Sequence, residues 1–205
     1  MKAKRKKNAV ICDLDDTIVD FLGLLVHFYN LKNNTCIHIS DLKDYAFETL
    51  SVEDQYGRLI NGKEFFKFFQ VYEKHGLYAA LPAITHSVHA LELIRILGYT
   101  IIILTARPSE YELTTELNLT VNRIPYDKII FSKDKAEQIK GLSRHYNIRC
   151  FVDDNLENVK AVLDTELVDN VYLIEKPHNR NKVVPEGITI VSDFIAVVRD
   201  LDDLR

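Results

Sequence analysis

The sequence predicts an α/β fold in which a parallel sheet is covered by helices on both faces. Short, continuous apolar runs alternate along the chain with longer segments in which apolar residues recur at helical spacing. The apolar runs lack the polar alternation of a half-exposed strand, which is typical of a sheet buried on both sides. Strands that alternate with helices are joined by right-handed crossovers, and such strands lie parallel.

The first strand is expected over residues 9–12, and the residues that follow it are mainly acidic. Asp13, Asp15 and Asp16 fall within four positions, and Thr17 adds a hydroxyl group. Open parallel sheets bind their ligands at the carboxyl ends of the strands. Carboxylates at positions i and i+2 can converge on one cation where the chain turns, so we interpret this stretch as a candidate active site.

Residues 33–80 differ from the rest of the chain in composition and in the pattern of apolar residues. A helix is predicted before them over residues 18–31, and another within them over residues 63–74. The segment is polar, rich in phenylalanine and tyrosine, and has no convincing run of period two. Ser51, with Asp54 three residues later, resembles a helix-capping box. We therefore expect a mostly helical insert whose aromatic residues form its own core, with one or two of them facing the candidate site.

Regular alternation resumes after the insert. Pro82 stands where a helix is expected to start, and Gly98 stands where that helix ends. The apolar strand that follows is rich in isoleucine. Helices are expected at residues 82–97, 109–119, 134–146, 156–163 and 192–201, and strands at residues 99–104, 128–131, 148–152, 170–174 and 188–191.

Composition indicates one sizeable domain with a small insert. The chain has 205 residues, of which 47% are apolar, and it contains only 7 Gly and 5 Pro. We place the core at residues 1–32 and 81–205 and the insert at residues 33–80, with a start near residue 20 as the alternative.

The net charge and the spacing of the cysteines indicate which binding partners and which cellular compartment to expect. The net charge of -4 provides no general attraction to nucleic acid or to anionic membranes. We interpret the basic run at residues 2–7 as a solvated terminus, with an arm that binds nucleic acid or a membrane surface as the alternative. The three cysteines, Cys12, Cys36 and Cys150, show no paired spacing, which is typical of a reducing compartment. With no signal peptide and no membrane-length apolar stretch, we expect a cytoplasmic protein that binds no membrane.

Polar residues also follow the later strands. Thr105 ends one strand, Lys133 and Lys135 follow the next, and Asp153 and Asp154 follow the strand after that. Each has an ordinary explanation, such as capping the next helix or solvation at its start. Because the ends of parallel strands share one edge, a hydroxyl, an ammonium and four carboxylates would gather in one crevice.

A hydroxyl, an ammonium and several carboxylates in one crevice are suited to few kinds of reaction. Carboxylates with few histidines favour a hard cation, and Mg²⁺ is the one we expect. A cation, a lysine and a hydroxyl together neutralise a phosphate dianion, beside which a carboxylate can act as nucleophile and form an aspartyl-phosphate. Positioning and charge neutralisation are most of what phosphoryl transfer needs.

In this order, the residues resemble the haloacid dehalogenase (HAD) superfamily of phosphohydrolases. Residues 13–17, Asp-Leu-Asp-Asp-Thr, resemble its first motif, DxDx[T/V], and residues 101–105, four apolar residues ending in Thr, resemble its second. A lysine that opens a helix is the third motif, and the pair Asp153-Asp154 resembles the acidic fourth. The resemblance implies a HAD-like Rossmannoid three-layer sandwich with a small helical (C1-type) cap inserted after the first strand.

The resemblance also implies a role for each matched residue. Asp13 is the nucleophile and a Mg²⁺ ligand, while Asp15 is first the general acid and then the base, and gives its backbone carbonyl to the metal. Thr105 binds the transferring phosphoryl group, and the lysine of the third motif holds the phosphate and the charge of the nucleophile. Asp154, with Asp153 beside it, completes the metal site.

Within the superfamily the chain is similar to the 5'(3')-deoxyribonucleotidase group. That group has a small helical cap between its first two motifs, and an Asp-Phe pair whose ring faces the nucleoside, where Asp20 and Phe21 stand here. Its third motif ends in a basic-Asp-Lys triplet, which favours Lys135 over Lys133 as the catalytic lysine. The chain departs from the group in having Asp16 where Gly is usual and in having no tryptophan, so base stacking would fall to Phe or Tyr.

The expected substrate contacts lie beside these motifs. Arg107 follows the second motif and either contacts phosphate or sugar or is a surface arginine at a helix start. The residues expected to bind substrate are Thr17, Phe21, Ala106, Arg107 and Lys133.

These expectations describe a Mg²⁺-dependent phosphomonoester hydrolase that acts on a nucleoside monophosphate or a similar small phosphorylated metabolite. Three alternatives stay open: a 3'-phosphatase on nucleic-acid ends, which the acidic net charge disfavours, a sugar-phosphate phosphatase, and a non-catalytic phospho-ligand binding protein on the same fold. The sequence does not determine the oligomeric state.

Overall fold

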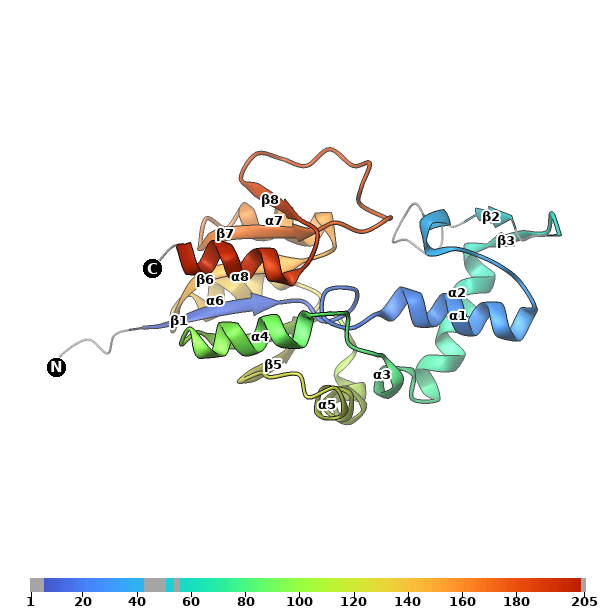
Figure 1. Cartoon of the computed structure of the whole chain (residues 1–205), viewed down its shortest axis with the longest axis horizontal. Helices are drawn as coiled ribbons and strands as arrows, with labels where there is room; N and C mark the ends of the chain where they lie inside the picture. The colour runs from blue at the N-terminus through green and yellow to red at the C-terminus, as the bar shows by residue number, and fades with distance from the viewer. Residues whose placement is uncertain (1–5, 43–50, 54–55, 204–205) are drawn as a thin grey trace.

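The computed structural model describes residues 6–42, 51–53 and 56–203, and its centre is a six-stranded sheet (Figure 1). The strands lie in the order β5-β4-β1-β6-β7-β8, and every neighbouring pair is parallel. The order reverses between β1 and β6, which is where open sheets of this kind bind ligands. The strands are β1 (Lys7–Cys12), β4 (Thr100–Thr105), β5 (Lys128–Phe131), β6 (Tyr146–Asp153), β7 (Val168–Ile174) and β8 (Ile188–Val191).

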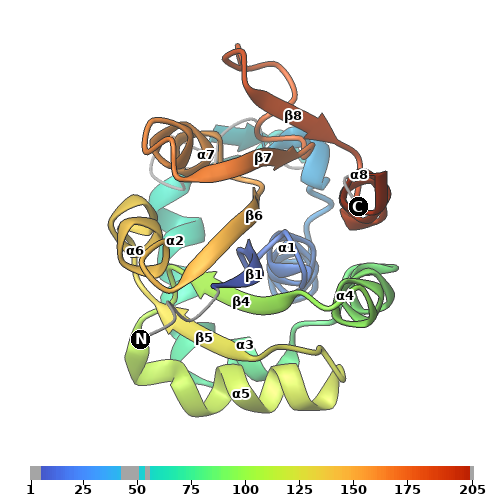
Figure 2. The same cartoon turned by 90° about the vertical axis from the view of Figure 1, so that its left-hand side faces the viewer.

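Helices cover both faces of this sheet, and Figure 2 shows the resulting three layers. In β4, Ile102 and Leu104 pack under α6 and α7, whereas Ile101 and Ile103 pack under α4 and α8 on the opposite face. The predicted α/β sandwich is therefore confirmed. The helices are α4 (Ser87–Ile96), α5 (Glu112–Val121), α6 (Lys135–Leu142), α7 (Leu156–Leu163) and α8 (Phe194–Asp203), with a short turn η3 (Ser109–Tyr111) before α5.

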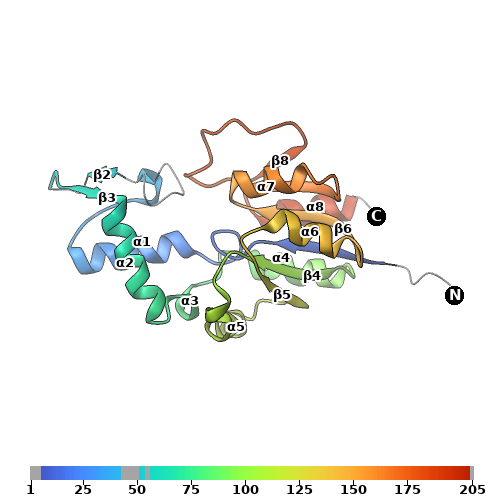
Figure 3. The ribbon, with the colours of Figure 1, turned by 180° about the vertical axis from the view of Figure 1, so that it is seen from behind.

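Residues 21–80, between the loop after β1 and the start of α4, form a lobe beyond the carboxyl edge of the sheet (Figures 1 and 3). Tyr29 of the first helix packs on the second, with its ring centroid 5.1 Å from that of Phe65 and 5.0 Å from that of Phe68. This packing agrees with an insert that starts near residue 20, although the division into domains remains a prediction. We call these elements the outer lobe: α1 (Phe21–Asn33), η1 (Ile39–Asp41), β2 (Ser51–Glu53), β3 (Leu59–Asn61), α2 (Gly62–Lys74) and α3 (Leu77–Ala80).

The prediction of a mostly helical insert is wrong in the middle of the outer lobe. Ser51, expected to cap a helix, instead pairs with Asn61 in the antiparallel strands β2 and β3, and Asp54 lies outside the described residues. Asn61 is the residue that caps a helix, since its side chain accepts a hydrogen bond from the backbone N–H of Glu64 at 3.0 Å. Each strand has only three residues, which is too short for a period of two to be visible in the sequence.

The helix predicted from Pro82 begins later, at Ser87. The backbone N–H of Ile84 donates to the carbonyl oxygen of Ile18 at 2.8 Å, and the hydroxyl of Ser87 donates to the same oxygen at 2.9 Å. The residues after Pro82 are thus used to fasten the loop that follows β1. No helix in the described ranges is long and apolar enough to cross a membrane.

Candidate active site

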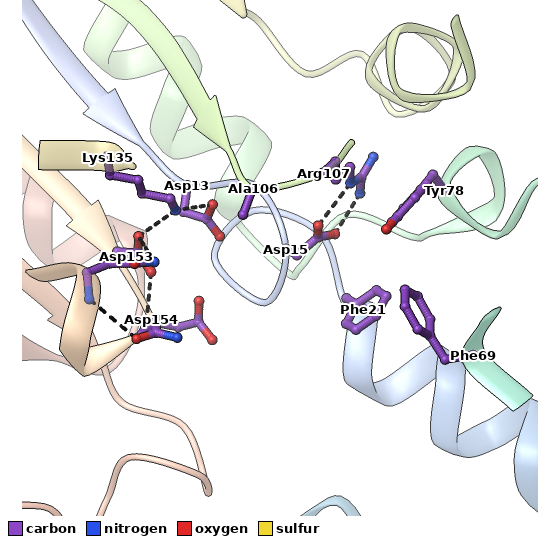
Figure 4. Close-up of a pocket in the computed structure, with 12 residues that line it drawn as sticks. Asp13, Asp15, Phe21, Phe69, Tyr78, Ala106, Arg107, Lys135, Asp153 and Asp154 are labelled. Carbon is purple, nitrogen blue, oxygen red and sulfur yellow. Dashed lines mark hydrogen bonds and ion pairs between the residues drawn. The ribbon is translucent and has the colours of Figure 1, made fainter. Parts of the chain in front are cut away.

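A cavity of about 250 Å³ lies between the carboxyl edge of the sheet and the outer lobe (Figure 4). Its position at the reversal between β1 and β6 is the one expected for a ligand site in such a sheet. Its lining comprises Asp13, Asp15, Phe21, Phe69, Tyr78, Ala106, Arg107, Lys135, Asp153, Asp154, Asn155 and Asn158.

Lys135 joins the ends of β1 and β6. Its ammonium donates to Oδ1 of Asp13 at 2.5 Å and to Oδ2 of Asp153 at 2.6 Å, as Figure 4 shows. Asp134 caps α6 through a bond from the N–H of Glu137, which makes Lys135 the first residue of the helix and directs it to the sheet edge. Lys135 is therefore the lysine that the structure brings to the site.

Burial and neighbouring charges set the protonation of this group. Burial raises the pKa of Asp13 well above its ordinary value, with Lys135 opposing and Asp153 and Asp154 adding to the rise. Burial also raises the pKa of Asp153, again against Lys135. For Lys135 burial acts in the other direction, but Asp13 and Asp153 outweigh it and its pKa is raised. Lys135 therefore remains a cation, and a further positive charge here would favour ionised carboxylates.

Three of these carboxylates are placed to hold a metal ion. Asp13, Asp153 and Asp154 are buried, and one carboxylate oxygen of each lies within 4.8 Å of the others. The single ammonium of Lys135 offsets only part of their charge, and burying the remainder is costly unless a cation binds. Carboxylate oxygens are ligands that Mg²⁺ prefers, so the donor set fits this ion. The side chain of Asp15 does not belong to the cluster, and the role of its backbone carbonyl stays a prediction.

Two residues that hold Asp154 are absent from the sequence prediction. The amide of Asn179 donates to the backbone oxygens of Asp154 at 2.7 Å and Ile174 at 2.8 Å. Nε2 of His178 lies 3.0 Å from Oδ2 of Asp154. Both residues are buried, and both follow β7. Glu175 and Lys176 come first after the strand predicted at 170–174, so position at a strand end does not single out His178 and Asn179.

Asp15 faces away from the metal cluster and contacts Arg107. Nε and Nη2 of Arg107 donate to the two carboxylate oxygens at 2.9 and 2.6 Å (Figure 4). The expectation that Arg107 contacts phosphate or sugar stays a prediction. The alternative of a surface arginine is wrong, because the residue is 3% exposed. The two acids of the first motif thus have separate cationic partners.

Asp16 stands where the 5'(3')-deoxyribonucleotidase group usually has Gly, and it fits the backbone conformation at this position. Its φ angle is 55°, a left-handed conformation that Asp adopts more readily than most residues. Its Oδ1 accepts hydrogen bonds from the backbone N–H groups of Phe21 at 3.1 Å and Leu22 at 2.9 Å. Asp16 therefore both makes the turn and accepts the first two backbone N–H groups of α1, whose N-cap residue is Asp20.

The remaining predicted residues occupy different positions relative to the cavity. Ala106 lines it, whereas Thr17 and Thr105 lie buried beside it. The hydroxyl of Thr17 donates to Oδ1 of Asp154 at 3.3 Å, and that of Thr105 accepts from the backbone N–H of Arg107 at 3.2 Å. Lys133, expected to bind substrate, is exposed and does not line the cavity.

The outer lobe closes the cavity with aromatic rings. Phe21 of α1 lies 5.5 Å from Phe69 of α2 in an edge-on arrangement and 6.5 Å from Tyr78 of α3 in a stacked one, measured between ring centroids. The expectation that one or two aromatic residues of the insert face the site is confirmed by Phe69 and Tyr78. The cavity therefore has a charged side and an aromatic side.

Comparison with known proteins finds the same fold. No family model matches the chain. A curated Bacillus cereus protein named "Putative nucleotidase" is 23% identical over 177 residues, which cover 84% of this chain and 89% of that protein. Among solved structures, an L-2-haloacid dehalogenase has a TM-score of 0.62 and 12% identity, with 95% of this chain and 99% of that chain covered.

A magnesium-bound structure is similar to the same degree. It is described as a "putative HAD-hydrolase" of Bacillus subtilis, has a TM-score of 0.59 and 15% identity, and covers 97% of this chain and 100% of its own. Other similar structures are described as phosphatases. The structural neighbours are HAD-superfamily hydrolases, and the fold of this chain is the HAD-like one that the sequence predicts.

Proposed function

We propose that the chain is a Mg²⁺-dependent phosphomonoester hydrolase that works through an aspartyl-phosphate on Asp13. The observation that carries the proposal is the group at the ends of β1 and β6, where Lys135 contacts Asp13 and Asp153 and Asp154 completes a cluster of three carboxylates. A lysine and a cation-binding cluster around one carboxylate are what a phosphate dianion and an attacking carboxylate require. The similarity to phosphatases and to a protein named as a nucleotidase supports the same reaction class.

Mg²⁺ held by Asp13, Asp153 and Asp154 would offset the repulsion between the carboxylate of Asp13 and the substrate phosphate. Lys135 orients that carboxylate and adds positive charge. A carboxylate oxygen of Asp13 attacks the phosphorus, and the bond from phosphorus to the leaving oxygen breaks. Asp15 gives that oxygen a proton, which requires Asp15 to enter the step protonated and released from at least one of its bonds to Arg107. The alcohol leaves, and the phosphoryl group stays on Asp13.

The second half of the reaction returns the enzyme to its starting state. Asp15, now deprotonated, takes a proton from a water molecule whose oxygen attacks the phosphorus. The bond between phosphorus and Asp13 breaks, and inorganic phosphate is released. The net change is hydrolysis of one phosphate ester, with Asp15 moving one proton in each half.

We further propose that the substrate is a nucleoside monophosphate or a metabolite of similar shape. Phe21, Phe69 and Tyr78 form a wall opposite the charged side of the cavity. Aromatic faces are suited to planar groups such as a nucleobase. These rings supply the stacking surface in a chain that has no tryptophan.

The test is a substrate screen with the purified protein and Mg²⁺. Nucleoside 5'- and 3'-monophosphates, sugar phosphates and a 3'-phosphorylated oligonucleotide are compared by the release of inorganic phosphate. We expect nucleoside monophosphates to have the highest kcat/KM and a chelator to remove the activity. Borohydride reduction during turnover should convert residue 13 to homoserine, detected by mass spectrometry. Full activity of Asp13→Asn, or activity unaffected by the chelator, would exclude the mechanism.

A further inference from the structure

The outward face of α5 carries a row of apolar side chains. Leu113, Leu117 and Val121 recur every four residues, which places them along one face of the helix. They are 79%, 52% and 66% exposed, respectively, and we call these three residues the α5 stripe. The outward face of a surface helix is usually charged or polar. A single exposed leucine is ordinary, but three apolar residues aligned on one helix mark a candidate interaction surface.

The opposite face of α5 is already occupied. Thr115 and Asn118 are fully buried there. The side-chain amides of Asn118 and Asn122 both donate to the backbone oxygen of Leu81, at 2.6 and 2.9 Å. Leu81 lies between α3 and α4, where the chain returns from the outer lobe to the core. The helix is therefore fastened from within, and Figure 2 shows it at the border of the molecule with no other element on its outward side.

The charges around the α5 stripe differ between the two ends of the helix. Glu112 and Glu116 lie in the N-terminal part of α5, and Arg123 follows its C-terminal end. None of these three side chains forms an ion pair within the part of the chain that the structure describes. A second α5 that runs in the opposite direction brings the acidic end of each helix to the basic end of the other. The surface is therefore complementary in charge to itself.

The spacing of the apolar residues fits the same arrangement. With Leu117 at a two-fold axis, Leu113 of one copy meets Val121 of the other, and Glu112 lies beside Arg123. The same patch then serves both copies, as in most two-fold dimers. Apolar residues fill the centre of the contact and charged pairs form its rim, which is the usual order in protein interfaces.

A membrane surface fits the α5 stripe less well. Helices that lie on anionic membranes carry lysine and arginine beside their apolar face. The α5 stripe instead has Glu112 and Glu116 beside it, which an anionic surface repels.

We propose that the α5 stripe is the contact between two copies of this chain in an antiparallel two-fold dimer. Helix α5 has ten residues, so it is about 15 Å long. A contact centred on one such helix buries less than the roughly 800 Å² per partner of a standard stable interface. The dimer is therefore a weak one, with a Kd of about 10 µM or higher.

Sedimentation velocity of the full chain from about 5 to 500 µM, a range that spans this Kd, tests the proposal. We expect the wild type to shift from the mass of one chain to that of two. Leu117→Glu sets two like charges face to face at the axis and should remove the shift. Val183→Glu is the matched control and should dimerise as the wild type does. Val183 is 89% exposed between β7 and β8, which Figure 2 shows on the opposite side of the molecule from α5.

Reversal of the rim charges tests the direction of the helices. Glu112→Arg alone and Arg123→Glu alone each place like charges opposite one another, so each should raise the Kd of the dimer about tenfold. The double variant exchanges the two charges and should restore the wild-type Kd. Restoration by a second substitution cannot come from a failure to fold.

The outcomes separate the possible occupants of the α5 stripe. A wild type that remains a single chain at every concentration would overturn the proposal. If that single chain sedimented with vesicles of phosphatidylcholine and phosphatidylserine, and Leu117→Glu did not, the α5 stripe would be a membrane contact instead. A dimer that persists in Leu117→Glu would place the interface elsewhere, and a double variant without rescue would overturn the antiparallel arrangement. None of these measurements depends on phosphatase activity, so the result is independent of the proposed function.

Discussion

The carboxyl edge of the sheet and the outer lobe face each other across one cavity, but different interactions hold them. At the sheet edge, buried ions are in contact: Lys135 with Asp13 and Asp153. In the outer lobe, rings such as those of Phe21 and Phe69 pack together without charge. In the proposed function these two regions would have separate tasks. The charged edge would carry the chemistry common to all phosphate esters, and the ring wall would favour one kind of ester.

The two kinds of contact also respond differently to substitution. Removing one partner of a buried ion pair leaves an uncompensated charge, whereas apolar packing accepts exchanges of similar volume. Substitutions at the sheet edge should therefore reduce turnover with every substrate. Substitutions in the outer lobe should change the preference among substrates.

The largest effect is expected for Asp13→Asn. The amide cannot form an aspartyl-phosphate, so kcat should fall by about 10⁴-fold or more with every substrate tested. The measurement is phosphate release under saturating substrate and Mg²⁺. Asp164→Asn is the matched control, because Asp164 is exposed at the end of α7, and its activity should equal that of the wild type. A substrate-dependent loss in Asp13→Asn would contradict the division of tasks.

Lys135→Met should reduce both activity and stability. The substitution leaves Asp13 and Asp153 buried without their ammonium partner, and loss of one member of such a group costs about 3–5 kcal/mol of unfolding free energy. Urea denaturation measures this loss, and added Mg²⁺ should recover part of it because a cation replaces the missing charge. Lys133→Met is the control: this exposed lysine two positions earlier should change stability by less than about 0.5 kcal/mol. Equal effects of the two substitutions would show that Lys135 has no special role.

Asn179→Ala should weaken Mg²⁺ binding without removing any metal ligand. The amide holds the backbone oxygens of Asp154 and Ile174, and residues that orient a ligand contribute about 10–100-fold to metal affinity. Isothermal titration calorimetry with Mg²⁺ measures this change independently of activity. Asn147→Ala, at an exposed position near the start of β6, is the control and should bind Mg²⁺ as the wild type does. Unchanged affinity in Asn179→Ala would restrict Asn179 to a structural role.

The smallest effect is expected for Phe69→Ala, and it should be selective. Loss of one stacking ring should raise KM for a nucleoside monophosphate about tenfold and leave that for glycerol phosphate nearly unchanged. Steady-state kinetics with both substrates gives the comparison. Val71→Ala, at an exposed position of the same helix, should change neither value. A general loss of kcat in Phe69→Ala would mean that the outer lobe takes part in the chemistry itself.

Much of the sheet edge could be predicted because its signals are local. A buried strand is a continuous apolar run, and the residue that ends the run is also the residue that reaches the edge, as with Asp13 and Asp153. The outer lobe was less predictable. Its strands β2 and β3 have three residues each, and its aromatic residues do not reveal from their spacing which of them face the cavity. Phe69 and Tyr78 reach it only because α2 and α3 fold back towards the sheet.

The sequence by itself determined the α/β sandwich and the group of acids with Lys135 at its carboxyl edge, because apolar period and strand ends are properties of neighbouring residues. The tertiary structure decided which side chains contact one another at the site. It paired Asp15 with Arg107, brought His178 and Asn179 against Asp154, and left Lys133 outside the cavity. These contacts join residues far apart in the chain, and their geometry depends on how helices pack, which no local pattern encodes.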